Sequence, residues 1–208
     1  MTQVHQGLIL YITITVFIIG CAGAPTQEMS DARQAINAAR DVEADYYMPA
    51  LWVKIEQNLA QAEQKLEAGK FKSARLFATL TKEQAASAHN MAVAIGRAKT
   101  IWQTITALGN SVPEMRILLE KAQLSAHQGN ADKAIKFAND AYHQGLLALN
   151  QTRLNQAKNL IDKMKARKES LPFEEQAILD LAQAALKRKE GEKAYELIKK
   201  LFEKQPEK

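Results

Sequence analysis

The sequence predicts an all-α protein: an elongated array of three helical hairpins with long second helices, preceded by one N-terminal helix. Alanine, the best helix former, supplies about a third of the hydrophobic residues, which make up 47% of the chain. Only five prolines and nine glycines interrupt the 208 residues, so helix breakers are rare. A pattern of small residues also recurs with a period of 60 residues.

A short apolar segment opens the chain. Residues 8–19 read LILYITITVFII, which is shorter than the ~20 residues that a transmembrane helix needs. The length is typical of the apolar part of a signal peptide. Cys21, the only cysteine of the chain, follows between Gly20 and Ala22. The stretch Ile18-Ile19-Gly20-Cys21 resembles the lipobox of bacterial lipoproteins. The alternative is an uncleaved apolar anchor with an incidental cysteine.

The lipobox resemblance implies how this segment is processed. Residues 1–20 would be removed as a signal peptide, and Cys21 would carry a diacylglycerol and an acyl chain such as palmitate. Residues 21–26 would then tether a helical repeat domain, residues 27–208, to the membrane. By analogy with lipoprotein sorting, the absence of Asp at Ala22 implies the periplasmic side of the outer membrane. The expected partner is therefore the membrane, through the lipid anchor.

The 60-residue period predicts helical hairpins. Ala62, Gly69 and Ala74 recur as Ala122, Gly129 and Ala134, and a third copy reads Ala182, Lys189 and Ala194, with its glycine displaced to Gly191. Glycine adopts the left-handed conformation that ends a helix, and the flanking alanines allow two helices to approach closely. The pattern resembles the turn of tetratricopeptide-type repeats, although those repeats have ~34 residues.

Proline and serine predict where each hairpin begins. Pro49, Pro113 and Pro172 each open an apolar helical segment. Gly109 ends the helix that precedes Pro113. Ser111 and Ser170 are expected to cap the helices that follow them. The expected helices are 27–46, 49–68 with 70–108, 113–128 with 130–169, and 172–188 with 191–204. The second and third hairpins thus cover residues 113–208.

The two long helices are each expected to bridge neighbouring hairpins. At 1.5 Å per residue they span roughly 60 Å, so the molecule should be elongated. The first half of each should pack on its own hairpin partner, and the second half should receive the first helix of the next hairpin. Gly96 and Gly145 lie inside these helices; each is interpreted as a close packing contact, with a bend in the helix as the alternative.

Residues 25–92 carry a second resemblance. They combine an Ala-rich helix, the bend Tyr47-Met48-Pro49 and an Ala-Leu hairpin containing glycine, all following a lipobox. This region is similar to a domain-of-unknown-function family of Gram-negative envelope lipoproteins. The resemblance implies an envelope lipoprotein and assigns no reaction.

The residue patterns predict no catalytic residues, no metal site and no cofactor. His5, His89, His127 and His143 lack the spacing of metal ligands, and no second cysteine is present. Nucleophile-elbow and phosphate-loop motifs do not occur. Carboxylates are plentiful, but their spacings are typical of exposed helix faces. The sequence therefore predicts a protein that is not an enzyme, with a peptidoglycan-modifying enzyme as the alternative.

Aromatic residues are the candidate partner contacts. Tyr46, Tyr47 and Trp52 form a cluster, and Trp102 lies late in a long helix. Tyrosine and tryptophan are enriched at interface hot spots, but the same residues could instead fill the core. Nucleic acid is not expected, because no aromatic residues alternate with the basic run KMKARK (163–168), which we interpret as a solvated helix end.

The expected function is therefore a membrane-anchored, non-catalytic scaffold or adaptor in the periplasm. Its expected partner is an envelope protein of unknown identity, or peptidoglycan. Stacked helical hairpins suit this role because they present extended grooves to extended ligands. An accessory subunit of an envelope export or assembly complex is the remaining alternative.

Overall fold

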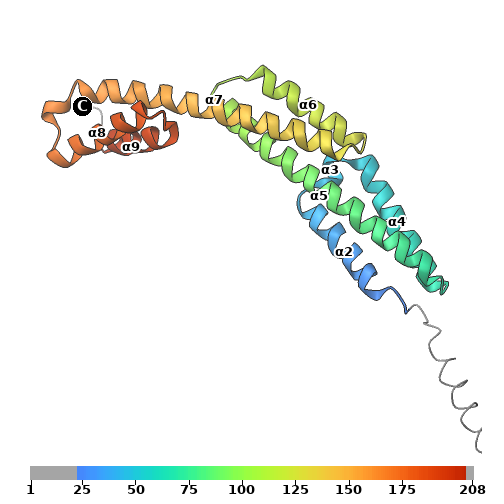
Figure 1. Cartoon of the computed structure of the whole chain (residues 1–208). Helices are drawn as coiled ribbons and strands as arrows, with labels where there is room; N and C mark the ends of the chain where they lie inside the picture. The colour runs from blue at the N-terminus through green and yellow to red at the C-terminus, as the bar shows by residue number, and fades with distance from the viewer. Residues whose placement is uncertain (1–22, 205–208) are drawn as a thin grey trace, which may run out of the picture.

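The all-α prediction is confirmed by the computed structural model, which describes residues 23–204 (Figure 1). Eight α-helices, one short 3-10 helix and no strand make up this part of the chain. Cys21 and the expected signal peptide lie outside the described residues. The elements are α2 (Thr26–Asp41), α3 (Ala44–Tyr47), α4 (Pro49–Glu67), α5 (Phe71–Ala107), α6 (Pro113–His127), α7 (Ala131–Lys165), η2 (Lys168–Ser170), α8 (Phe173–Lys187) and α9 (Gly191–Glu203).

Three of the turns repeat the same backbone hydrogen bonds at the 60-residue period. In the first, the N–H of Gly69 donates to the carbonyl of Leu66, and that of Lys70 donates to Lys65. The equivalent pairs recur in the α6–α7 turn and in the α8–α9 turn. This is the Schellman arrangement, which satisfies the last free carbonyls of the first helix in each hairpin. The hairpin prediction is therefore confirmed.

The third turn corrects the expected place of its glycine. The left-handed position is occupied by Gly69 (φ 68°) in the first turn and Gly129 (φ 73°) in the second, but by Lys189 (φ 60°) in the third. Gly191 instead begins α9, where a Cβ would collide with the backbone oxygen of Asn150 on α7. Glycine is thus needed at 191 for close helix approach and not for turn geometry.

Two further boundaries differ from the sequence prediction. The expected helix 27–46 is divided, because α2 ends at Asp41 and Glu43 adopts a left-handed conformation (φ 60°) before α3. The break turns the chain so that Ala44 and Tyr47 point into the core. The predicted serine caps are also wrong, because Val112 and Pro172 occupy the cap positions of α6 and α8 without side-chain hydrogen bonds.

The helices pack as three successive layers (Figure 1). The first consists of α2, α4 and the first part of α5, and the second of the rest of α5, α6 and the first part of α7. The third contains the end of α7 with α8 and α9. In Figure 1 the layers follow one another along a curved, elongated molecule, with α2 toward one end and α8 and α9 at the other.

The sequence predicts that the long helices receive the first helix of the next hairpin, and the structure differs from this prediction in part. The second part of α5 contacts both helices of the next hairpin, but it packs more extensively on α7 than on α6. Likewise, the end of α7 packs more extensively on α9 than on α8. The repeat positions support these close contacts, because their alanines are fully buried: Ala62, Ala122, Ala182, Ala74, Ala134 and Ala194.

No helix between residues 23 and 204 is both long enough and apolar enough to cross a membrane.

Candidate functional site

The structure separates the four aromatic candidates by burial and by place. Tyr47 and Trp52 are both only 7% exposed, whereas Tyr46 is 69% exposed. Trp102 is half-buried and packs in the second layer, beside the cluster that contains Ile105 and Met115. The rings of Tyr46 and Tyr47 are in contact, Trp52 shares a core cluster with Tyr47, and Trp102 lies elsewhere. Cys21, the lipidation candidate, lies outside the described residues.

Trp52 belongs to the packing of the first layer. Its indole N–H donates to the carboxylate of Glu56 at 2.8 Å, so its one polar atom is already satisfied. The guanidinium of Arg40 lies 5.4 Å from the Trp52 ring centroid and 3.5 Å from Glu56. The side chain thereby fixes α2 against α4, and the core interpretation is the one that its contacts favour.

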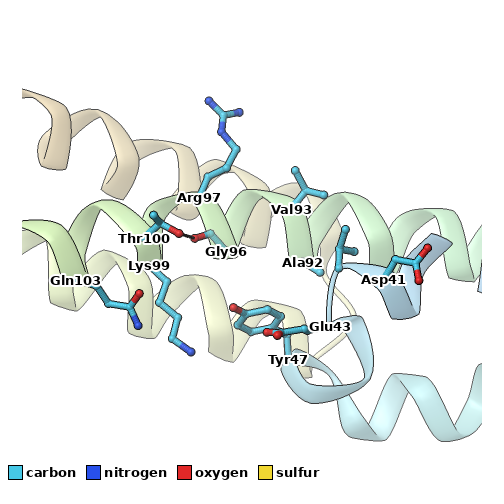
Figure 2. Close-up of a pocket in the computed structure, with 11 residues that line it drawn as sticks. Asp41, Glu43, Tyr47, Ala92, Val93, Gly96, Arg97, Lys99, Thr100 and Gln103 are labelled. Carbon is cyan, nitrogen blue, oxygen red and sulfur yellow. Dashed lines mark hydrogen bonds between the residues drawn. The ribbon is translucent and has the colours of Figure 1, made fainter. Parts of the chain in front are cut away.

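Tyr47 differs, because it borders a cleft between α3 and α5. The cleft has a volume of about 430 Å³ and opens where α2 ends and the chain turns into α3 (Figure 2). It is lined by Asp41, Val42, Glu43, Tyr47, Ala92, Val93, Gly96, Arg97, Lys99, Thr100 and Gln103. The lining thus joins one residue of the aromatic cluster to a charged stretch of α5 that is about 50 positions later in the chain.

The Tyr47 hydroxyl has no hydrogen-bond partner among the described residues. Figure 2 shows it beside the backbone of Gly96, and a Cβ at Gly96 would lie 3.9 Å from the Tyr47 oxygen. Burial raises the pKa of the Tyr47 phenol above its ordinary value of 10.0, and the nearby charge of Lys99 partly opposes this shift. Glu43 and Tyr46 reinforce the increase in pKa. The phenol is therefore a neutral donor at physiological pH.

Lys99 is held over the two tyrosine rings. Its ammonium lies 5.2 Å from the Tyr46 ring centroid and 5.5 Å from that of Tyr47, while the two rings pack edge to face at 5.4 Å. Within residues 23–204 no carboxylate lies within ion-pair distance of Lys99. Tyr46 therefore helps to position a cation at the edge of the cleft, although its own ring is exposed.

The remaining polar groups of the α5 rim point in different directions. Arg97 extends away from Tyr47 in Figure 2, and its guanidinium lies 4.5 Å from the Tyr142 ring centroid on α7. The Thr100 hydroxyl donates to the carbonyl of Gly96 at 3.0 Å. Lys99 and Gln103 extend on the same side as Tyr47. The charges that act on the Tyr47 phenol therefore come from Lys99 of α5 and from Glu43.

Sequence reasoning found Tyr47 and missed the residues that face it. Glu43, Lys99 and Gln103 carry no local motif, and their proximity depends on the packing of α3 against α5. Gly96 is the one residue of this part of α5 that the sequence pattern singles out, but the close packing expected there is wrong. Only the Tyr47 hydroxyl would lie within 4 Å of a Cβ added at Gly96. Gly145 fulfils that expectation, because a Cβ there would press on Ile101 and Met115 of the second layer.

Between residues 23 and 204, no group of three or more His, Cys, Asp or Glu side chains is placed to hold a metal ion.

Comparison of the sequence with known protein families finds a match to one region of the chain. Residues 27–99 match a family described as Domain of unknown function (DUF4398). The match begins in α2, ends at Lys99 in α5 and so contains most of the cleft lining. Its bounds are close to the 25–92 expected from the sequence. No curated protein and no solved structure matches the chain.

Proposed function

We propose that the protein is an outer-membrane lipoprotein, anchored by an acylated Cys21, that acts in the periplasm as a non-catalytic helical scaffold or adaptor. Its partner would be an envelope protein or the cell wall. The helical hairpins would hold that partner at a set distance from the membrane, in the manner of tetratricopeptide-type and other stacked helical repeats.

The observation that carries the proposal is the short distance along the chain between Cys21 and the first helix. The helix α2 begins at Thr26, so at most about 17 Å of extended chain separates the lipidation candidate from the folded array. The helices α5 and α7 have 37 and 35 residues, which corresponds to roughly 50–55 Å each. A lipid on Cys21 would thus hold one end near the membrane while the other layers extend away from it.

The anchor is tested by intact mass and membrane fractionation. The protein would be expressed in a Gram-negative host beside Cys21→Ala, and inner and outer membranes would be separated on a density gradient. We expect the native chain to lose residues 1–20, to gain the mass of the acyl chains and to sediment with the outer membrane. Cys21→Ala should lose both the added mass and the outer-membrane location. An unmodified full-length native chain would contradict the proposal.

The scaffold role is tested separately by cross-linking in intact cells followed by purification. We expect one envelope protein, or peptidoglycan, to be recovered with the native chain in stoichiometric amount. The competing role is a peptidoglycan-modifying enzyme, and its nearest candidate group is the Glu43 carboxylate at the cleft. Release of soluble peptidoglycan fragments by the purified protein, abolished in a folded Glu43→Gln variant, would favour the enzyme over the scaffold.

A further inference from the structure

We propose that the cleft between α3 and α5 binds a zwitterionic group, a carboxylate and an ammonium a few ångströms apart, as in an amino-acid head group. The ligand could be a free amino acid or an amino-acid end exposed on a peptide. The inference goes beyond the scaffold role and does not depend on the lipid anchor, because it rests on α5, on α3 and on Glu43, which precedes α3.

The first observation is the unpartnered hydroxyl of Tyr47. The residue as a whole is 7% exposed, but its hydroxyl oxygen remains accessible to solvent at the cleft, and it makes no hydrogen bond to the part of the chain that the structure describes. The hydrogen-bond donor of this hydroxyl is therefore available to water or to a ligand that replaces the water. A ligand oxygen in the cleft would accept the hydrogen bond that the protein leaves open.

The second observation is the separation of charge around this hydroxyl. Lys99 and Glu43 both act on the Tyr47 phenol, from positions that do not form an ion pair with one another. Arg97 also lines the cleft but extends away from Tyr47 toward Tyr142, so Lys99 and Glu43 are the opposite charges that act on this phenol. A purely anionic ligand would be repelled by the Glu43 carboxylate, and a purely cationic one by the Lys99 ammonium. A dipolar ligand can place its carboxylate at Lys99 and its ammonium at Glu43.

The third observation is the absence of a side chain at Gly96, beside the Tyr47 hydroxyl. A Cβ there would meet the Tyr47 oxygen alone, at 3.9 Å, so the glycine leaves space beside that hydroxyl. The Gln103 amide lies further along the same side of α5 (Figure 2). A small ligand could therefore reach Tyr47 and Lys99 together, with an additional hydrogen bond available from Gln103.

The test uses ligands that differ only in their charged groups. Binding to the full chain, purified in detergent, would be measured by isothermal titration calorimetry. The zwitterionic probe is meso-diaminopimelate, and its matched controls are pimelate, which lacks the amines, and cadaverine, which lacks the carboxylates. We expect diaminopimelate to bind at least roughly tenfold more tightly than either control, because each control loses one charge-assisted contact. Equal binding of pimelate, or no binding of diaminopimelate, would overturn the proposal.

A second arm distinguishes the two sources of the ligand. A peptidoglycan tripeptide ending in diaminopimelate keeps one zwitterionic end free and would be titrated beside the free amino acid. Tighter binding of the tripeptide would identify the cell-wall peptide as the ligand, and tighter binding of the free compound would identify a free amino acid. Failure of both to bind would reject the site, while the mass of Cys21 would still decide the lipoprotein proposal.

Variants locate the binding at the cleft. Tyr47→Phe removes only the hydroxyl and should weaken diaminopimelate binding by about 3- to 10-fold. Lys99→Met keeps the aliphatic stem and should weaken it by roughly tenfold or more. Lys136→Met is the matched control, because Lys136 also lies over an aromatic ring, that of Phe137, at 5.9 Å but outside the cleft. Native affinity in both Tyr47→Phe and Lys99→Met would contradict the assignment.

Discussion

At the scale of single residues, the Tyr47 hydroxyl connects the stability of the protein to its candidate site. Its oxygen makes no hydrogen bond to the protein between residues 23 and 204 and is accessible to solvent, so it contributes no internal hydrogen bond to stability. Its ring, by contrast, packs into the cluster that joins the first layer to the second. The two parts of one side chain therefore have separable roles, and a single substitution can distinguish them.

Tyr47→Phe should leave stability at neutral pH unchanged, or raise it by up to ~1 kcal/mol, because no native hydrogen bond is lost. The pKa of Tyr47 is raised in the folded state by burial, so the folded protein resists ionisation of this phenol. The contribution of the neutral Tyr47 phenol to the free energy of unfolding is therefore fully present below pH 10.0, which is the ordinary pKa of tyrosine. It is lost as pH rises through the higher pKa of the folded state.

Thermal unfolding at several pH values, followed by circular dichroism, measures this difference. The native protein should lose more stability than Tyr47→Phe above pH 10, since only the native chain has this phenol. Parallel curves for the two proteins would show that the Tyr47 phenol does not resist ionisation in the folded state.

Gly96 and Gly145 give a second pair of predictions with opposite signs. Gly96→Ala should stabilise the protein by about 0.5–1 kcal/mol, because alanine favours the helix and the new Cβ would make an ordinary contact 3.9 Å from the Tyr47 oxygen. Gly145→Ala should destabilise it by roughly 1–3 kcal/mol, because its Cβ would meet Ile101 and lie 2.9 Å from the Met115 methyl group.

Urea unfolding of both variants checks the pair. Destabilisation by Gly96→Ala would mean that the space between Gly96 and Tyr47 is more crowded than the 3.9 Å approach to the Tyr47 oxygen indicates. If Gly145→Ala were neutral, the layers around α5, α6 and α7 would pack less closely than the structure has them.

At the scale of elements, the three hairpin turns form an internal comparison. They share their hydrogen bonds, but the left-handed position is glycine in two and lysine in the third. Lys189→Gly should therefore stabilise the protein by ~1 kcal/mol, and Gly129→Ala should destabilise it by a similar amount. For a chain of this size each change corresponds to a shift in Tm of about 2–4 °C. Calorimetric Tm values that move in the same direction for both variants would contradict the shared geometry.

The helix α2 is attached to α5 by two ion pairs that respond to acid. Glu28 contacts Arg75 at 2.6 Å and Asp31 contacts Lys82 at 2.7 Å. The pKa of Glu28 is lowered by its own backbone N–H and then by Arg75, and that of Asp31 by Lys82 and then by Gln27. Both contributions to stability are present above the ordinary values of 4.5 and 3.8, and are lost as pH falls through the lower folded values.

A double variant, Glu28→Gln with Asp31→Asn, isolates this acid response. Between pH 6 and pH 3 its Tm should fall less than that of the native protein. Glu120→Gln is a suitable control, because the exposed Arg116–Glu120 pair lies within α6 alone and does not join two helices. A double variant with the native pH profile would show that the two pairs do not secure α2.

Local residue patterns predicted the elements well and the contacts between them poorly. The spacing of Ala62, Gly69 and Ala74 marks a hairpin because it determines both the turn and the crossing of adjacent helices. The division of the first helix at Glu43 had no such signal, since no glycine or proline marks it. The cleft was missed for the same reason: Glu43 and Lys99 meet through packing of α3 on α5, which no local periodicity records.

At the scale of the whole molecule, each long helix belongs to two layers at once. The core residues of α5 are divided between the first and second layers, and those of α7 between the second and third. The end of α7 carries α8 and α9 through its own cluster, in which Ile161 and Met164 meet Leu179 and Leu201. Because successive layers are linked by continuous helices, the array is expected to be stiff along its length.

Small-angle X-ray scattering tests this shape. A compact globule of about 190 residues has a radius of gyration of ~16 Å, and the elongated array should give a value well above it. A chain that begins at Gly23 would avoid the lipidation candidate, and its distance distribution should show a long tail beyond the roughly 55 Å length of α5 alone. A radius near 16 Å would mean that α8 and α9 fold back on the first layer. That result would remove the basis for holding a partner away from the membrane.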